Sequence, residues 1–238
     1  SPVDVVVSPT LIEDLARMQD GYEVATSAGT RAVAEDEGGA VAARATLDEV
    51  KGFALAQETE LSAMPFGVPD LAQLSRSGLG GDIPLHMGFA DSSLVKWVGT
   101  SGDQEVLRPP GSSLDEASLG ALADLGFTTL LLDGGVVQQP RQEKGFAPPA
   151  TAAITSGPNP TPVAIVPDEG IQNLITSSVA RDDPRLAVQL LLGDLASIWQ
   201  EQPDQARVVA MLVSAEQGLP AALFDPLVRD ISTAPWIR

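Results

Sequence analysis

Short apolar runs, typical of strands, alternate along the chain with amphipathic segments, typical of helices. A Pro, Gly or Ser and then an acidic helix start follow most of these runs. Parallel strands need a crossover that is usually a helix, so this alternation predicts a parallel β/α architecture, in which ligands gather where strands end. The predicted strands are, in chain order, Val3–Val7, a run that ends near Met64, Val106–Arg108, Phe127–Leu132, Val163–Val166 and Val208–Val213.

Helix starts are marked by capping residues. Ser8 precedes Pro9, and Asp70 follows Pro69, so each predicts the first turn of a helix. Ser113 with Glu116 three residues later predicts a capping box for a helix that ends at Gly126. Asp183 and Pro184 predict the start of a helix over residues 185–200.

Three further segments complete the predicted organisation. Residues 27–39 hold three glycines and an acidic triplet, which predicts an exposed loop. The segment 138–162 is rich in proline, but Ala150–Thr155 can pair as a hairpin with Val163–Val166. The leucines of residues 185–200 and Trp199 predict a helix buried over much of its circumference. Val3–Val7 alternates too little for a half-buried strand and predicts burial on both faces.

The count of strands falls short of a closed barrel. We therefore predict one domain over residues 1–238 with an incomplete, TIM-like (β/α) barrel of parallel strands. A hydrophobic content of 44% with 19% charged residues is ordinary for a folded domain. This length is also normal for a single α/β barrel.

Net charge limits the partners. With 14 basic and 32 acidic residues the chain carries −18, which would repel a phosphate backbone, and no basic stripe offsets it. Nucleic acid is therefore not an expected partner, whereas cations are compatible. No apolar stretch reaches a membrane-spanning length, so direct membrane insertion by this segment is not expected. The chain is either cytosolic or an excised mature fragment.

Most signatures of catalytic chemistry are absent from the sequence. There is no P-loop, nucleophile elbow or HExxH motif, and without cysteine there is no thiolate nucleophile or Cys-ligated zinc. His86 is the single histidine, and its amphipathic surroundings favour a structural role over that of a ligand. We therefore predict no metal and no cofactor.

Carboxylates after predicted strands are the main candidates for chemistry. Asp133 ends the Phe127–Leu132 strand, where it either points into the strand-end cleft or binds the amides of its own turn. Asp168 and Glu169 follow another strand, but Pro167 makes them typical first-turn helix acids. As a pair, Asp133 and Asp168 would suit glycoside chemistry at about 5 Å for retention or about 6.5–9.5 Å for inversion.

Two other side chains are candidates for ligand binding. Arg108 interrupts an apolar run before two prolines, so it either reaches the cleft to meet an anion or pairs with a nearby aspartate. Trp97 and Trp236 could stack on a sugar ring. Aromatic residues make up only 4% of the chain, however, which favours core packing for both.

Several segments, in this order, resemble a family of bacterial cell-envelope proteins of unknown function: SPTLIEDLARMQDGY, PFGVPDLAQL, DLGFTTLLLD, PVAIVPDEGIQNLI, RLAVQLLLGDLASIWQEQPDQARVV and APWI. That family is similar to family 57 glycoside hydrolases and polysaccharide deacetylases, which have β/α barrels. The resemblance implies a secreted, membrane-anchored full-length protein with this chain as its extracytoplasmic barrel. The paired histidines of catalytic relatives are absent here, and the chain begins at what would be the second barrel strand.

These observations leave three hypotheses. The leading one is a noncatalytic envelope barrel that binds a glycan or a protein partner in cell-wall biogenesis. Its rival is a polysaccharide hydrolase or deacetylase that uses Asp133 with a second strand-end acid such as Asp168. The third is a scaffold within a larger assembly, which predicts a broad exposed apolar patch.

Overall fold

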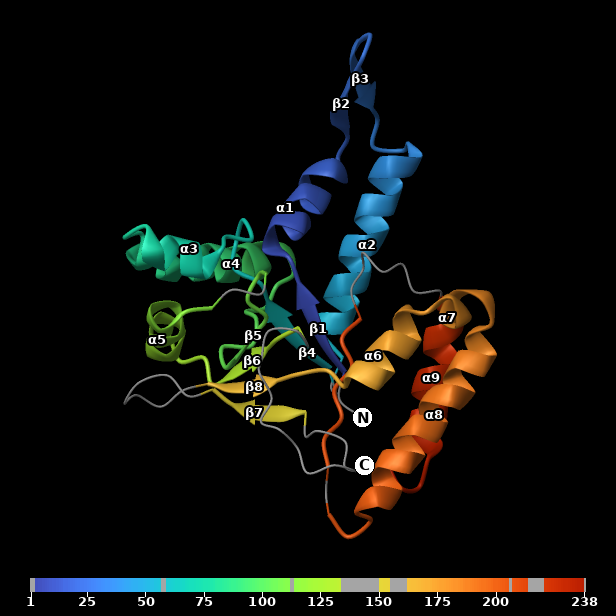
Figure 1. The fold of residues 1–238 in the computed structure, drawn as a ribbon. Helices are drawn as coiled ribbons and strands as arrows, with labels where there is room; N and C mark the ends of the chain where they lie inside the picture. Colours follow the sequence, from blue (N-terminus) through green and yellow to red (C-terminus); the bar gives the residue numbers. More distant parts are fainter. Residues whose placement is uncertain are drawn as a thin grey trace. The chain divides into compact units, whose positions relative to one another are not determined.

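A computed structural model describes residues 3–56, 59–111, 114–133, 150–154, 162–205, 207–213 and 221–237 (Figure 1). The chain divides into two compact units. The N-terminal unit runs to Leu130, and the C-terminal unit contains Leu131–Ile154 and Val163–Arg238. Each unit is described by itself below.

The N-terminal unit alternates strands and helices, as the sequence predicts. Its elements in chain order are β1 (Val3–Val7), α1 (Pro9–Met18), β2 (Tyr22–Thr26), β3 (Gly29–Val33), α2 (Gly38–Ala54), β4 (Thr59–Ala63), α3 (Leu71–Arg76), the 3₁₀ turn η1 (Gly80–Asp82), α4 (Ile83–Trp97), β5 (Val106–Leu107), α5 (Glu116–Asp124) and β6 (Thr129–Leu131), whose last residue belongs to the C-terminal unit.

Parallel pairing in this unit confirms the predicted β/α arrangement. β1 pairs with β4 in a register that sets Val5 opposite Leu61 and Val7 opposite Ala63, and β5 pairs in parallel with β6. Successive strand residues face opposite sides, so one face of β1 and β4 is apolar. That face packs on residues of the three covering helices, α1, α2 and α4: Ile12, Ala16, Leu47, Ala90 and Leu94.

The predicted burial of β1 on both faces is wrong. Val7 is buried, but Asp4 is exposed, and Val5 and Val6 are half-buried. Asp4 shares its face with Val6, away from the helices. β1 is therefore an amphipathic strand whose second face carries a charge.

The predicted loop at residues 27–39 is also wrong in part. β2 and β3 form an antiparallel hairpin with Thr26 opposite Gly29, and it projects beyond the ends of α1 and α2 (Figure 1). Gly29 has a φ of 126°, a conformation that glycine adopts readily, and the Thr26 hydroxyl donates to the Gly29 carbonyl at 2.7 Å. The hairpin is mostly exposed, so it lacks the apolar alternation by which strands are predicted.

Capping chemistry largely fixes the helix starts. Ser8 caps α1, as predicted, and Asp70, predicted at the start of the next helix, caps α3. Ser113, predicted to form a capping box with Glu116, lies outside the described residues, and α5 begins with a capping box between Asp115 and Ser118. The Asp115 carboxylate accepts from the Ser118 amide, and the Ser118 hydroxyl accepts from the Asp115 amide, both at 2.9 Å.

The C-terminal unit contains a small sheet and a group of helices. The antiparallel pair of β7 and β8 confirms the predicted hairpin, and the Leu132 amide donates to the Ile165 carbonyl next to it. Its elements are β7 (Thr151–Ala153), β8 (Val163–Ile165), α6 (Glu169–Thr176), α7 (Ser178–Asp182), α8 (Pro184–Glu201) and α9 (Ala221–Thr233).

Helix α8 starts where the sequence predicts but is less buried than expected. Asp183 caps it by accepting from the Leu186 amide at 3.1 Å. Its buried residues are Ala187, Val188 and Leu191, whereas Leu186, Leu190 and Trp199 are exposed. The tilted Trp199–Trp236 contact, at 6.3 Å between ring centroids, lies at the C-terminal end of this helix.

The predicted strand at Val208–Val213 is not a strand. Its backbone is held by separate contacts: the Ala150 amide donates to the Val208 carbonyl and the Asp168 amide to the Ala210 carbonyl. The Gln172 side chain takes the place of a neighbouring strand at Leu212, donating to its carbonyl at 2.7 Å and accepting from its amide at 3.2 Å. This continuous apolar run is therefore half-buried, with Val208 exposed, and forms no strand ladder.

The described residues contain parallel strands in two sheets and no closed barrel. Within the same described parts, no helix has both the length and the apolar character needed to cross a bilayer.

Candidate functional site

The carboxyl ends of β1 and β4 carry a group of residues that we call the strand-end cluster: Thr10, Phe66, Val68, His86 and Phe89. Thr10 lies in the first turn after β1, Phe66 and Val68 follow β4, and the other two lie on α4. The Gly67 amide donates to the Thr10 hydroxyl at 3.0 Å, which ties the two strand ends together. This is the edge at which parallel α/β folds place ligands.

His86 is fixed by two hydrogen bonds to one residue. Its Nδ1 lies 2.7 Å from the Phe66 carbonyl oxygen, and the Phe66 amide donates to the His86 carbonyl at 3.1 Å. A carbonyl can only accept, so Nδ1 carries the proton. In the neutral ring Nε2 is then an acceptor. The structural role predicted for His86 is therefore present, and it orients a second nitrogen that can accept a hydrogen bond from a ligand.

An aromatic surface adjoins this histidine. The rings of Phe66 and Phe89 are tilted by 57° with centroids 6.1 Å apart, and Phe89 is 61% exposed. Val68 is exposed and has a φ of 51°, in the left-handed region that a β-branched residue rarely adopts. Such strain persists where the surroundings enforce it, often at binding sites. The cluster can offer a ligand an aromatic face and a hydrogen-bond acceptor.

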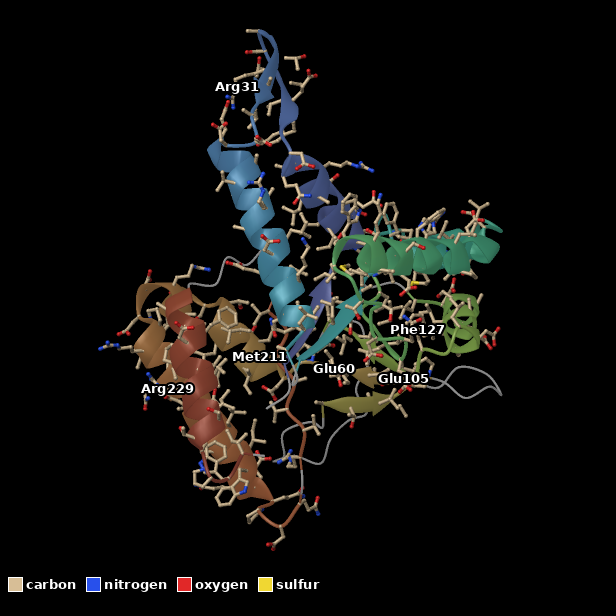
Figure 2. The ribbon with its side chains drawn as sticks, turned by 180° about the vertical axis from the view of Figure 1, so that it is seen from behind. Arg31, Glu60, Glu105, Phe127, Met211 and Arg229 are labelled. Carbon is tan, nitrogen blue, oxygen red and sulfur yellow. The ribbon has the colours of Figure 1, made fainter. Side chains whose placement is uncertain are left out.

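A second polar group lies on the face of β1 and β4 away from the helices. The buried Ser62 hydroxyl donates to both carboxylate oxygens of Asp4, at 3.1 and 3.2 Å. Desolvation raises the pKa of Asp4, the Ser62 bond opposes that rise, and the charges of Glu60 (Figure 2) and Asp103 add to it. Sequence reasoning missed this group, although Glu60 and Ser62 alternate as one strand face requires.

The acidic residues named from the sequence lie in the C-terminal unit. Asp133 follows β6 and is exposed. Asp168 caps α6 by accepting from the Ile171 amide at 3.0 Å, and Glu169 is exposed in the first turn. Asp133 and Asp168 thus follow neighbouring strands of one sheet, but the Asp168 carboxylate serves its helix.

Arg108 and Trp97 lie in the N-terminal unit. Arg108 is half-buried directly after β5. Trp97 packs against the core of β1 and β4, and the Lys96 ammonium lies 4.3 Å from its ring centroid. The Trp97 indole nitrogen is buried without a hydrogen-bond partner. Across the described part of the chain, no group of three His, Cys, Asp or Glu side chains is placed to hold a metal ion.

Comparison with known proteins identifies similar folds rather than a family. No family model matches the chain, and no curated protein matches it either. The chain superposes over its whole length on 32% of a 4-alpha-glucanotransferase from Thermococcus litoralis, with a TM-score of 0.65 and 14% identity. It also superposes on the alpha-amylase AmyC from Thermotoga maritima, over its whole length and 63% of that protein, with a TM-score of 0.58 and 9% identity.

A third similar structure is a putative polysaccharide deacetylase from Mycobacterium smegmatis. The superposition covers 82% of this chain and 64% of that one, with a TM-score of 0.51 and 14% identity. The chain therefore spans less than two thirds of each of the three proteins. At these identities the likeness establishes a glycosidase- and deacetylase-like fold, in agreement with the resemblance read from the sequence.

Proposed function

We propose that this chain is a noncatalytic domain of the cell envelope that binds a glycan at the strand-end cluster. The observation that carries the proposal is the pairing of an exposed aromatic ring, Phe89, with the fixed imidazole of His86 at the carboxyl ends of β1 and β4. Sugar rings combine apolar faces with hydroxyl donors. An aromatic surface beside a hydrogen-bond acceptor complements both features.

The fold supports the choice of a glycan over a protein partner. The similar structures are named as a glucanotransferase, an amylase and a polysaccharide deacetylase, all of which are carbohydrate-active by name. An incomplete barrel is part of this proposal, with its binding edge at the strand ends. Placement in the envelope, secretion and a membrane anchor outside this segment rest on the family resemblance of the sequence.

The absence of catalysis is supported by one locked carboxylate. The hydrolase hypothesis needs two strand-end acids that share a cleft, but Asp168 accepts the Ile171 amide as a helix cap. A capping carboxylate is already hydrogen-bonded to its own helix and is less available to a substrate.

A binding screen tests the proposal. Immobilised glycans and muropeptides are probed with the whole chain, with Phe89→Ala and with Val95→Ala, which trims a similarly exposed apolar residue of α4. Losing a ring contact of about 1 kcal/mol weakens binding roughly fivefold. We expect this loss for Phe89→Ala alone. Equal loss in both variants, or no binding to any glycan, would refute the proposal.

The likeness to glycosidase and deacetylase folds favours a hydrolase or deacetylase as a second candidate. It predicts release of reducing sugar or acetate from cell-wall polysaccharide and loss of that activity in Asp133→Asn. A product signal that persists in Asp133→Asn would remove Asp133 from this role, and turnover that depends on Asp133 would overturn the noncatalytic proposal.

A further inference from the structure

A hollow of about 240 Å³ opens on the surface of the N-terminal unit. One wall is the face of α4 that carries Pro84, Met87, Gly88 and Asp91, at the i, i+3, i+4, i+7 spacing of a single helix face. His86 and Phe89 project from another side of the same helix, so the hollow is distinct from the strand-end cluster. The segment 102–104 and residues near the end of α5 form the remaining walls.

The floor of the hollow is apolar. Ala63, Ala90 and Phe127 line it and are buried, and Phe127 lies beside α5 in Figure 2. Met87 and the exposed Leu125 extend this lining towards the rim. A ligand that fills the floor therefore has a compact apolar body.

The side chains of Asp91, Asp103 and Gln104 can offer a ligand only hydrogen-bond acceptors. The Gln104 amide nitrogen donates to the Gly102 carbonyl at 2.9 Å and to the Asp91 carboxylate at 3.5 Å, which uses both of its protons and leaves its oxygen. One oxygen of Asp103 accepts from the amides of Glu105 and Val106, and the other remains. Asp91 adds a second carboxylate. These groups complement a donor with no acceptor of its own.

Charge selects the same kind of ligand. The lining residues include two carboxylates and no Lys, Arg or His, and the chain as a whole carries −18. A field of this sign concentrates cations at the surface. We propose that the hollow binds a primary ammonium ion on a compact apolar body, with the ammonium group between Asp91, Asp103 and the Gln104 oxygen. This site goes beyond the glycan proposal and does not depend on it.

The test is a titration of the whole chain with cyclohexylammonium chloride, followed by amide NMR shifts. Cyclohexanol and cyclohexanecarboxylate have the same ring and serve as neutral and anionic probes. We expect saturable shifts at residues 84–91 and 102–104 with cyclohexylammonium alone, weakened by added salt. Asp91→Asn removes one partly exposed charge contact, for which about 1 kcal/mol predicts roughly fivefold weaker binding.

Gly88 offers a matched pair of variants. A Cβ built at Gly88 meets no atom within 4 Å, so Gly88→Met would extend a side chain into the hollow, whereas Gly88→Ala would leave most of it open. Binding should be lost in Gly88→Met and retained in Gly88→Ala. Equal binding of cyclohexanol, unchanged affinity in Asp91→Asn, or binding to folded Gly88→Met would overturn the proposal. Should Gly88→Met not fold, the Asp91→Asn and salt measurements still decide.

Discussion

The two ring nitrogens of His86 should be separable by mutation. Nδ1 holds the Phe66 carbonyl, whereas Nε2 faces no hydrogen-bonding partner among the described residues. In asparagine, the amide nitrogen occupies the position of Nδ1 and nothing replaces Nε2. His86→Asn should therefore keep the loop after β4 in place and remove the acceptor offered to a ligand, whereas His86→Ala removes both.

The size of the structural effect follows from the hydrogen bond. His86→Ala removes the bond from Nδ1 and leaves the half-buried Phe66 carbonyl unpaired. Such a loss lowers the local free energy of opening by about 1 kcal/mol. That free energy corresponds to roughly fivefold faster opening of the loop. The amides of Phe66 and Gly67 report on it, since they donate to the His86 carbonyl and the Thr10 hydroxyl.

Amide hydrogen exchange measured at native pH provides the assay. Exchange at Phe66 and Gly67 should accelerate about fivefold in His86→Ala and return close to the wild-type rate in His86→Asn. Glycan binding should be weakened in both variants. Unchanged exchange in His86→Ala, or full glycan binding by His86→Asn, would refute the assignment of separate roles to the two nitrogens.

Three further predictions concern the polar groups of both units. The pKa of Asp4 is raised in the folded protein, so the folded state binds this proton more tightly than the unfolded chain does. The contribution of Asp4 to the free energy of unfolding therefore falls as the pH rises from about 4 through the folded pKa. Urea unfolding of Asp4→Asn should therefore show a gain over wild type at pH 7 that disappears at pH 3, and a constant difference would contradict the desolvation argument. Asp168→Ala should cost about 1 kcal/mol through loss of the α6 cap, against Glu169→Ala as an exposed control in the same turn. Gln172→Ala should accelerate amide exchange at Leu212 far more than at Ile171, and equal acceleration would show that α6 unfolds as a whole.

Local chemistry accounts for what could be predicted of the fold. Ser8, Asp70 and Asp183 cap helices because a short side chain with an oxygen can reach the amide three residues on, which needs no knowledge of the tertiary structure. The continuous apolar run Val208–Val213 predicts a strand, but such a run indicates only a tendency to be buried and not a strand partner. The partner that would make it a strand is here the side chain of Gln172.

The candidate site was less accessible to sequence reasoning. His86 was assigned a structural role from its amphipathic surroundings, and its bond to Phe66 confirms one, but the contact joins residues 20 positions apart and no local pattern predicts it. Phe89 gave no signal, since an aromatic residue on a helix usually faces the core. The strain at Val68 likewise depends on how β4 joins α3, which is a property of the fold.

The strand-end cluster and the group around Asp4 lie at opposite ends of β1 and β4. Asp4 and Glu60 are each the second residue of their strand, so their carboxylates belong to the amino-terminal half, where the residues of β/α folds serve stability and not ligand binding. The strand-end cluster lies at the opposite edge. The bond between Asp4 and Ser62 should therefore affect the free energy of unfolding and leave binding unchanged, whereas Phe89 should affect binding alone. If Asp4→Asn weakened glycan binding as much as Phe89→Ala, the binding edge would have been assigned to the wrong end of β1 and β4.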